Sequence, residues 1–347
     1  VPELLPGAKG AAFSGLWIHD AVGLFVTPMA LAIIYFVIPA STGRPIYSHF
    51  LSMLGFWLLF FLYPLNGTHH YVFSVIPMSA QIGAILASTL LGVDVVIVVA
   101  NLFLSLRGTG WFPKDAALRF VGTGTMFYLI VSIQGSLQAQ MSLNRRVHFS
   151  DWVVGHSHLA MVGFASFAAL GGLVHAWQRL PDSRYHPGYV NVGYWLLLLG
   201  VVAMFGDLTV AGIVESRIWE TSAPWLDSVR AAKPYWAVRA ATFAPIAGGF
   251  LIVMMGLFAG APNGLTEMSM LLLGVWPGQA LDEEIRATVP KGIRDLTAGE
   301  KRGRVIYGRE GCAYCHTQQV RSVDADVARF GKATAAWETK FEVPHLW

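Results

Sequence analysis

Seven apolar stretches constrain the fold of this chain more than any other feature of its sequence. Each holds about the twenty apolar residues that a helix needs to cross a hydrocarbon core of about 30 Å. Polar or turn-forming segments separate the stretches, and tryptophan and tyrosine lie near many of their ends, as membrane interfaces favour. The predicted membrane helices are residues 15–40, 48–66, 77–106, 116–140, 152–178, 188–216 and 236–261. The sequence therefore predicts an all-α integral membrane protein with seven transmembrane helices.

Charged residues are concentrated at the C-terminal end of the chain. Only 13% of the 347 residues are charged, against roughly 25% in a typical soluble domain. Residues 281–347 hold 21 of the 45 charged residues. We therefore expect a membrane domain over 1–262, a linker over 263–300 and a water-soluble domain over 301–347. A net charge of +3 gives no reason to expect a nucleic-acid partner.

Both cysteines of the chain belong to one C-x-x-C-H motif near the C-terminus. This motif is typical of c-type haem attachment, in which Cys312 and Cys315 form thioethers and His316 binds the iron. A redox or zinc C-x-x-C is the alternative, but no further cysteine exists to complete a four-thiolate zinc site. No methionine follows Met270, and His345 is the one late candidate for a sixth ligand. We therefore expect a partial c-type cytochrome domain.

Histidines within the predicted spans mark a second site, since ionisable residues inside membranes are rare and usually functional. His156 and His158 lie two residues apart near the start of a helix. At about 100° per residue their side chains point about 200° apart. Such a pair does not bind one metal together, but it suits two haems on opposite sides of the helix. Two hydrogen-bonded core histidines are the alternative interpretation.

A second pair, His69 and His70, follows the helix predicted over 48–66, in a segment expected to be non-helical. Adjacent histidines in such a segment can converge on one metal, and copper is well suited to imidazole ligands. Copper needs a third ligand, for which His19 on the first predicted helix is the candidate. For His69 and His70 alone, a polar interfacial loop is the alternative.

These residues together resemble the catalytic subunit of the haem-copper oxidases, and in particular the C-type class of bacterial cytochrome c oxidases with b-type haems. The resemblance covers about residues 15–260, which match the last seven of the twelve helices in that subunit. It rests on His19-Asp-Ala-Val-Gly-Leu-Phe-Val-Thr27, on Tyr63 with His69-His70, and on Ser150-Asp-Trp-Val-Val-Gly-His-Ser-His158. From about Gly303 the tail resembles the start of the mono-haem cytochrome c subunit of the same enzyme, so we expect a fusion.

The resemblance implies a ligand set for four cofactors: a high-spin haem b, a low-spin haem b, a haem c and copper. Copper would be bound by His19, His69 and His70. The high-spin haem would have His156 as its proximal ligand, and the low-spin haem would have His158 as one axial ligand.

Tyr63 would be the active-site tyrosine, which this class cross-links to the first copper histidine, here His19. A phenol at this place can give an electron and a proton for O–O cleavage, whereas Tyr63 taken alone would be an interfacial tyrosine. Ser52 lies eleven residues earlier on the same helix face, and Tyr35 lies toward the same side of the membrane. Because the proton channel of the family uses hydroxyls at matching places, Tyr35 and Ser52 are candidates for a proton path. Ordinary helix-face hydroxyls are the alternative.

The resemblance implies a terminal respiratory oxidase of the bacterial inner membrane, with its haem c domain on the periplasmic side. Electrons from a soluble or membrane cytochrome c would enter at haem c and pass through the low-spin haem to the high-spin haem and copper. Oxygen would be reduced to water there, with proton uptake. Membrane lipid and other oxidase subunits are the expected partners, and nucleic acid is not.

Three features depart from the family pattern. The first five helices of the family subunit have no counterpart, and one of these carries the second ligand of the low-spin haem. The remaining histidines are poor substitutes because they lie in loops or at helix ends: His49, His148, His175 and His186. Gln134 stands where the family usually has a glutamate, which argues against proton pumping. Seven crossings also place the ends of the membrane domain on opposite faces, while the haem c tail must lie outside.

A nitric oxide reductase of the same superfamily is a second hypothesis. Those enzymes have iron at the copper position, usually with an added carboxylate, and lack the tyrosine. Asp20 beside His19, together with Gln134, fits that pattern. A non-enzymatic haem carrier of the membrane is a third hypothesis, but the C-x-x-C-H motif and the lack of a Trp-Trp-Asp segment count against it.

Overall fold

The described part of the chain is helical and falls into two units. The computed structural model describes all residues except 1–7, 111, 181–183, 222, 260–296 and 310–347. The chain divides into Val1–Ala261 and Pro262–Trp347. In the described residues, seven helices are long and apolar enough to cross a membrane: Gly15–Thr42, His49–Tyr71, Met78–Ser105, Ala116–Gln138, Asp151–Trp177, Pro187–Trp219 and Leu226–Phe258. The predicted all-α membrane architecture is thereby confirmed.

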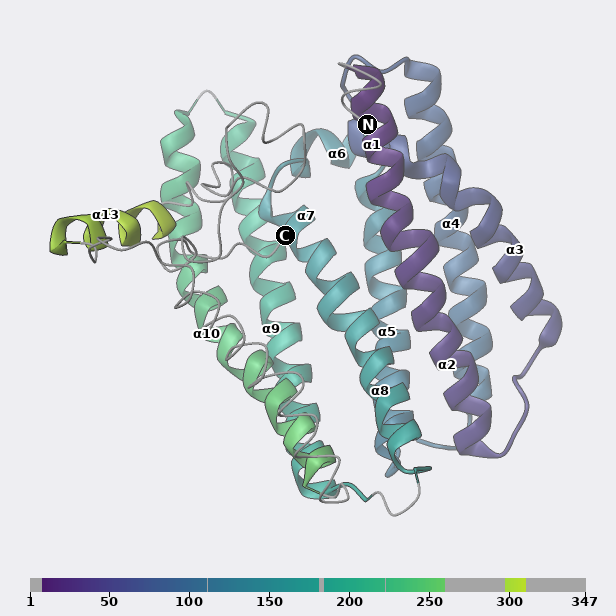
Figure 1. The fold of residues 1–347 in the computed structure, drawn as a ribbon. Coiled ribbons are helices and arrows are strands. Elements are labelled where there is room, and N and C mark those ends of the chain that lie inside the picture. The colour runs from purple at the N-terminus through teal and green to yellow at the C-terminus, as the bar shows by residue number, and fades with distance from the viewer. Residues whose placement is uncertain (1–7, 111, 181–183, 222, 260–296, 310–347) are drawn as a thin grey trace, which may run out of the picture. The chain divides into compact units, whose positions relative to one another are not determined.

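The first unit is a bundle of long helices that lie side by side (Figure 1). Its first half consists of α1 (Ala8–Asp20), η1 (Ala21–Val26), α2 (Thr27–Thr42), α3 (His49–Asn66), η2 (Gly67–Tyr71) and α4 (Met78–Ser105). Its second half consists of α5 (Ala116–Gln138), α6 (Met141–Val147), α7 (Asp151–His158), η3 (Leu159–Ala165), α8 (Ser166–Trp177), α9 (Pro187–Trp219) and α10 (Trp225–Phe258). The segments η1 and η3 are π-helical and η2 is a 3₁₀-helix.

Side-chain caps set the starts of several helices. Ser48 and Asp115 accept hydrogen bonds from backbone N–H groups three residues later, at the starts of α3 and α5. Ser150 caps α7 in a similar way. Such caps satisfy N–H groups that the helix itself leaves without a partner. At the other end of α2, Gly43 adopts a left-handed conformation with φ of 66°, which ends a helix at little cost for glycine.

One predicted boundary is wrong. The last membrane helix was expected to start at residue 236, but α10 starts at Trp225. Its first turns carry Asp227 and Arg230, which form an ion pair with 3.1 Å between Oδ1 and Nη1. Such a charged segment does not belong to an apolar stretch, so hydropathy alone places the start of the helix too late. The other six spans start and end within a few residues of the prediction.

Close contacts between small residues bring α9 and α10 together. A side chain at Gly193 would meet the Gly249 carbonyl oxygen at 2.8 Å, and one at Gly249 would meet the Gly193 carbonyl oxygen at 3.0 Å. Small residues at such crossings let two helix backbones approach closely inside a membrane. The core between α5, α8 and α9 is aromatic, with Phe120, Phe167 and Tyr194 fully buried.

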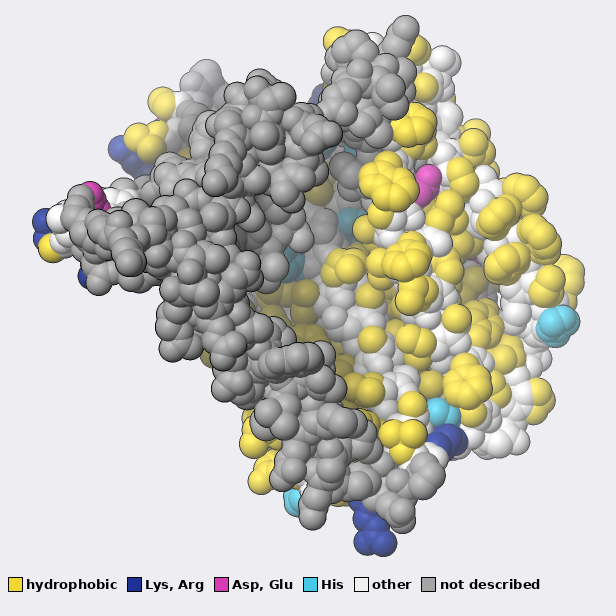
Figure 2. Space-filling view, viewed as in Figure 1, with side chains coloured by type: hydrophobic (Ala, Val, Ile, Leu, Met, Phe, Trp, Pro, Cys, Tyr) yellow, Lys and Arg dark blue, Asp and Glu magenta, His cyan; other side chains and the backbone are white. Residues whose placement is uncertain are grey.

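The outer surface of the bundle is apolar, as Figure 2 shows for one face. On α3, four aromatic side chains are exposed and stack on one another: Phe56, Trp57, Phe60 and Phe61. A soluble protein rarely exposes such a large apolar surface. This surface therefore fits contact with lipid.

The second unit is described only around α13 (Ala298–Arg309). Thr297 and Glu300 form a reciprocal cap at its start, in which the Glu300 carboxylate accepts from the Thr297 backbone N–H at 2.7 Å and the Thr297 hydroxyl accepts from the Glu300 N–H at 3.3 Å. This is the capping box that starts many helices. The apolar piece at 268–276 and the whole C-x-x-C-H motif lie outside the described residues.

Candidate metal centre

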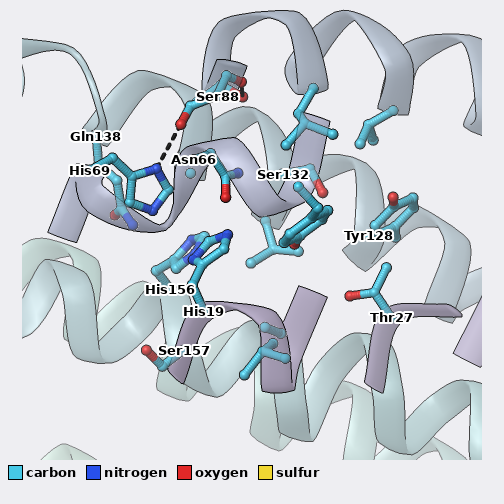
Figure 3. Close-up of a pocket in the computed structure, with 18 of the residues that line it drawn as sticks. His19, Thr27, Asn66, His69, Ser88, Tyr128, Ser132, Gln138, His156 and Ser157 are labelled. Atoms are coloured by element: carbon cyan, nitrogen blue, oxygen red, sulfur yellow. Dashed lines mark hydrogen bonds between the residues drawn. The ribbon is translucent and has the colours of Figure 1, made fainter. Parts of the chain in front are cut away.

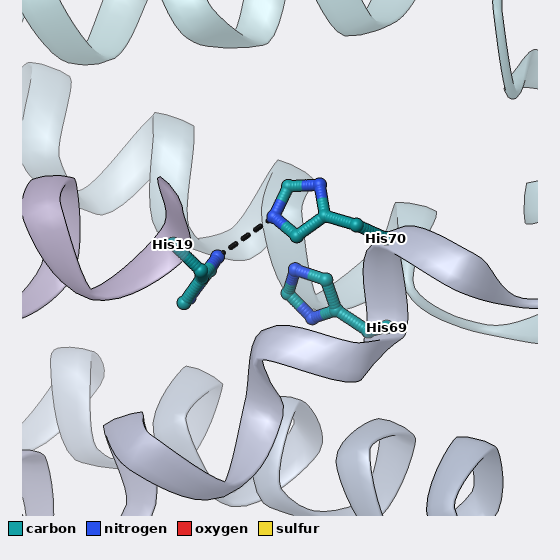
Figure 4. A group of neighbouring side chains, drawn as sticks. All are labelled: His19, His69 and His70. Atoms are coloured by element: carbon teal, nitrogen blue, oxygen red, sulfur yellow. Dashed lines mark hydrogen bonds between the residues drawn. The ribbon is translucent and has the colours of Figure 1, made fainter. Parts of the chain in front are cut away.

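Three imidazoles from distant parts of the sequence meet inside the bundle (Figure 4). His19, His69 and His70 each offer a ring nitrogen, and these three atoms lie within 4.8 Å of one another. Nδ1 of His19 lies 2.8 Å from Nε2 of His70. The structure thus brings together the three histidines for which the sequence predicts copper binding.

The local fold explains this meeting. His19 lies in the last turn of α1, immediately before the π-helical segment η1. His69 and His70 lie on η2, so the expected non-helical segment is in fact one turn of 3₁₀-helix. Because 3₁₀-helices turn by about 120° per residue, the two rings leave the backbone at different angles. They still converge, with ring centroids 4.6 Å apart.

Ser88 on α4 fixes the orientation and tautomer of His69. The Ser88 hydroxyl donates its single hydrogen to the Ala84 carbonyl at 2.7 Å. It therefore accepts at its 2.6 Å contact with Nδ1 of His69, so Nδ1 carries the proton. The other nitrogen, Nε2, is left with a free lone pair, which is the form that binds a metal.

Tyr63 lies next to His19. The two rings stack with centroids 5.0 Å apart and planes 30° apart. Gly23 of η1 makes room for the tyrosine, since a side chain at that position would overlap the Tyr63 ring. The predicted proximity of Tyr63 to the first copper histidine is therefore present in the fold.

One pocket joins these residues to His156 (Figure 3). It is lined by His19, Tyr63, His69, His70 and His156, together with apolar side chains of α4, α5 and η3. The Nδ1 atom of His156 is buried and has no hydrogen-bond partner among the described residues. Gly135 on α5 faces this ring, and a side chain there would lie 2.9 Å from its Cε1 atom.

His158 points away from this pocket, as the spacing predicts. It is exposed in the bundle and is not among the pocket residues. Its Nδ1 donates to the Val154 carbonyl at 2.8 Å, because a carbonyl only accepts. Nε2 is thus free to bind a metal on the opposite side of α7 from His156.

An ion-pair network fixes α7, which carries both histidines. The Arg239 guanidinium of α10 donates to both oxygens of Asp151, at 3.4 and 2.5 Å. Its Nε also lies 3.6 Å from the buried Asp207 carboxylate of α9. Glu215 of α9 accepts from the Asp151 backbone N–H at 2.8 Å. Three helices are held together at the start of α7.

The predicted proton-path residues lie far from the imidazoles, near the start of α3. The Asn101 amide donates to the Ser52 hydroxyl at 2.9 Å and to the Ser48 carbonyl at 3.0 Å. The Tyr35 hydroxyl is buried and lies beside Ser52 and Asn101. Tyr35 and Ser52 therefore belong to one polar cluster, to which Asn101 also belongs.

Four residues near these groups were not predicted from the sequence: Asp94, Asn101, Ser88 and Tyr128. Asp94 is the only charged residue of α4, so the rarity of charges in membrane spans was a usable signal. Ser88 and Tyr128 are ordinary residue types, and only the fold places them at the pocket. Gln134 is buried, and neither of its amide atoms has a partner within the described ranges; its neighbour Gly135 lines the pocket and Gln134 itself does not.

Of the other histidines, His175 is buried and hydrogen-bonded to Ser41 at 2.8 Å. His148 lies in the loop before α7, outside the membrane spans, and its partial burial lowers its pKa. His186 caps the start of α9, and His49 starts α3. The proposed haem c ligands Cys312, Cys315 and His316 lie outside the described residues.

The residues present fit a copper ion and haem iron. Three imidazoles form a donor set that suits copper, and Nδ1 of His19 already faces Nε2 of His70 at 2.8 Å. His156, across the same pocket, adds a buried imidazole of the kind that binds haem iron.

Comparison with known proteins gives the family of the chain. The family model for cytochrome c and quinol oxidase polypeptide I matches residues 7–245. The chain belongs to this family. The model for the mono-haem subunit of cytochrome c oxidase, FixO, matches residues 268–347. This member of the oxidase polypeptide I family therefore carries a segment of the mono-haem subunit at its C-terminal end, as expected for a fusion.

Curated relatives of this oxidase polypeptide I chain include a bacteroid cytochrome c oxidase subunit 1 homolog of Bradyrhizobium diazoefficiens. It is 33% identical over 277 residues, which are 76% of this chain and 50% of the relative. The Cbb3-type cytochrome c oxidase subunit CcoN1 of Stutzerimonas stutzeri is 28% identical over 262 residues, 72% of this chain and 55% of the relative. The chain thus spans about half the length of these relatives.

A subunit of the nitric oxide reductase of Stutzerimonas stutzeri is a more distant relative. It is 29% identical over 117 residues, which are 32% of this chain and 24% of the relative. The chain therefore belongs to the haem-copper superfamily. The oxidase subunits match a much larger share of the chain than the reductase subunit does.

Proposed function

We propose that this chain provides the oxygen-reducing centre and the haem c of a membrane terminal oxidase that takes electrons from cytochrome c. The observation that carries the proposal is the convergence of His19, His69 and His70 with Tyr63 stacked on His19. A three-imidazole copper site with an adjacent phenol is what four-electron reduction of oxygen needs, because the phenol can supply an electron and a proton.

The proposal gives one role to each of the five histidines in and beside the pocket. His19, His69 and His70 bind copper, His156 is the proximal ligand of a high-spin haem b, and His158 is one axial ligand of a low-spin haem b. The haem iron and copper, when bound, supply the metal pair at which oxygen is reduced to water. The opposite directions of His156 and His158 on α7 support the assignment of two separate haems.

The protein orients these groups and surrounds part of the site with apolar side chains. Ser88 holds His69 in the tautomer that leaves Nε2 free. Arg239 and Asp151 fix the start of α7 and so the position of its two histidines. Apolar side chains, including Leu91, Val131 and Phe164, line the pocket and give it the low polarity that strengthens electrostatic effects in a site.

The path of electrons and protons follows from the same assignment. Cys312, Cys315 and His316 would hold haem c, and that group would supply the entry point for electrons on their way to the low-spin haem. Tyr35 and Ser52 take part in proton delivery, and Tyr63 holds the last proton at its Oη atom. We place the protein in the bacterial inner membrane with haem c on the periplasmic side, in a complex with other oxidase subunits. The proposed domains are 1–262, a linker over 263–300, and 301–347.

A nitric oxide reductase is the second candidate. It is favoured by Asp20, which follows His19 directly and whose buried Oδ1 atom has no hydrogen-bond partner in the described part of the chain, and by the amide at Gln134. Tyr63 at the His19 ring favours the oxidase.

The test measures oxygen uptake by the intact complex with reduced cytochrome c, together with its metal content. We expect cyanide-sensitive uptake and copper. Non-haem iron with turnover of nitric oxide would favour the reductase, and absent or cyanide-insensitive uptake would exclude the oxidase. Tyr63→Phe should abolish uptake while haem and copper remain bound, whereas Tyr189→Phe, at an exposed tyrosine of α9, should leave it unchanged.

A further inference from the structure

A carboxyl group is buried in the middle of the bundle and has no role in the site described so far. Asp94 of α4 is fully buried, and neither of its carboxylate oxygens has a hydrogen-bond partner among the described residues. None of the ion pairs in the described part of the chain includes it. Burying an unpaired carboxylate anion is far more costly than burying the neutral acid. The fold therefore favours an acid that holds its proton.

Asp94 packs against α3 at a position made open by glycine. A side chain at Gly55 would lie 3.4 Å from Oδ1 of Asp94. Gly55 lies on the inward face of α3 between Ser52 and Tyr63, since positions 3, 8 and 11 residues apart share a side of an α-helix. Ser52 and Tyr63 are themselves about 16 Å apart along the helix axis, too far for a direct proton transfer. Asp94 lies between them.

On the side of Ser52, a hydrogen-bonded cluster leads toward Asp94. Asn101 is seven residues after Asp94, so it lies on the same face of α4, about 10 Å along the axis. Its amide holds the Ser52 hydroxyl at 2.9 Å. Tyr35 of α2 lies beside these groups and within electrostatic reach of Asp94.

On the side of the metal centre, Asp94 adjoins the pocket wall. Leu91 and Val95, three residues before it and one after it on α4, both line the pocket. Tyr128 of α5 also lines the pocket and lies within electrostatic reach of both Asp94 and Tyr63. Two tyrosines from neighbouring helices, Tyr35 and Tyr128, thus lie within electrostatic reach of Asp94, and no ion pair among the described residues includes it.

We propose that Asp94 is a proton carrier between the Ser52–Asn101 cluster and the Tyr63 side of the pocket. The inference rests on the proposed oxidase function and adds a residue to its proton supply. The Asp94 carboxyl releases the proton of its O–H bond toward the pocket and becomes a carboxylate. The same group then takes up a proton from the Ser52 side, so that only O–H bonds break and form. Gln134 is an amide and cannot do this.

The test uses the intact, purified complex with Asp94→Asn, Asp94→Glu and the matched control Asp227→Asn. Asp227 is an exposed aspartate in an ion pair with Arg230. The measurements are oxygen uptake, proton uptake on reduction recorded with a pH indicator, and the infrared C=O band of protonated carboxylic acids. Haem and copper contents report assembly.

For Asp94→Asn we expect turnover and the rate of proton uptake to fall together by about tenfold or more, with metal contents unchanged. Asp94→Glu should restore much of both, and Asp227→Asn should match the wild type. In the wild type, an acid C=O band should respond to reduction, and this band should be absent in Asp94→Asn and shifted in Asp94→Glu. Wild-type proton uptake in Asp94→Asn would overturn the proposal.

The experiment distinguishes failed assembly of a variant from failure of the proposed oxidase function. Should Asp94→Asn fail to assemble, the infrared band of Asp94→Glu decides: a shift supports the proposal and an unchanged band overturns it. Should the wild-type complex fail to reduce oxygen, the proposed oxidase function fails. The infrared band still reports whether Asp94 changes its protonation when the haems are reduced.

Discussion

Ser88 accepts a hydrogen bond from Nδ1 of His69 at 2.6 Å, and this contact decides which nitrogen of that imidazole can bind a metal. The serine hydrogen is already given to the Ala84 carbonyl, so the tautomer of His69 is fixed by the protein before any metal binds. A hydrogen-bond partner of a metal-binding histidine commonly has a large effect on metal affinity, because it sets the tautomer and the orientation of the ring.

Ser88→Ala should therefore weaken copper binding by about 10- to 100-fold, because His69 loses its orientation and its fixed tautomer. Copper retention during dialysis against a graded chelator measures this change. Ser41→Ala is the matched control, since it removes another serine–histidine hydrogen bond, with His175, at 2.8 Å. Equal copper retention in Ser88→Ala and the wild type would contradict the role assigned to Ser88.

Arg239→Gln should destabilise the start of α7, because it leaves Asp151 and the buried Asp207 without their cation. Breaking a partly buried pair of this kind costs about 3–5 kcal/mol. The thermal unfolding midpoint and the haem content of the purified complex should both fall. Arg146→Gln breaks an exposed pair with Glu220 and should cost less than about 1 kcal/mol. Similar decreases of the thermal midpoint in the two variants would contradict the role assigned to Arg239.

Gly23→Ala should displace Tyr63, because the added methyl group overlaps its ring. We expect oxygen uptake to be largely lost while copper and haem remain bound. Gly83→Ala on α4 is the control, since no atom lies within 4 Å of the position its methyl group would take. Retained uptake in Gly23→Ala would show that the position of Tyr63 does not matter.

The partial burial of His148 predicts that the stability of the protein depends on pH. Burial lowers the pKa of His148 below its ordinary value of 6.5 in the folded protein, so the unfolded chain binds this proton more readily. His148 therefore does not change the free energy of unfolding at higher pH, and it lowers this free energy as the pH falls through about 6.5. Thermal midpoints at pH 8 and pH 5.5 should therefore differ more in the wild type than in His148→Asn. An equal difference in both would refute the prediction.

Hydropathy and spacing were enough to predict the membrane spans and to place the histidines in two groups. The opposite directions of His156 and His158 follow from helix geometry alone, and the meeting of His19 with His69 and His70 followed from the family resemblance. The start of α10 was missed because its first turns are charged. Ser88, Tyr128 and Asn101 were missed because ordinary polar residues acquire meaning only from what they face across the bundle. Asp94 was visible in the sequence as the one charge of its span.

Because of the two π-helical segments η1 and η3, the number of residues beside the site affects its geometry as much as the identity of those residues does. Each follows directly after a histidine-bearing helix, η1 after His19-Asp20 and η3 after His158. A π-turn holds about one residue more than an α-turn, and it is less stable. Deleting one residue from Ala21–Val26 would therefore let the helix run regularly and gain stability, while rotating His19 by about 100° relative to α2. The bundle gives up regular hydrogen bonding at these two places, next to the turns that carry its imidazoles. The number of residues in Ala21–Val26 thus sets the direction in which His19 points.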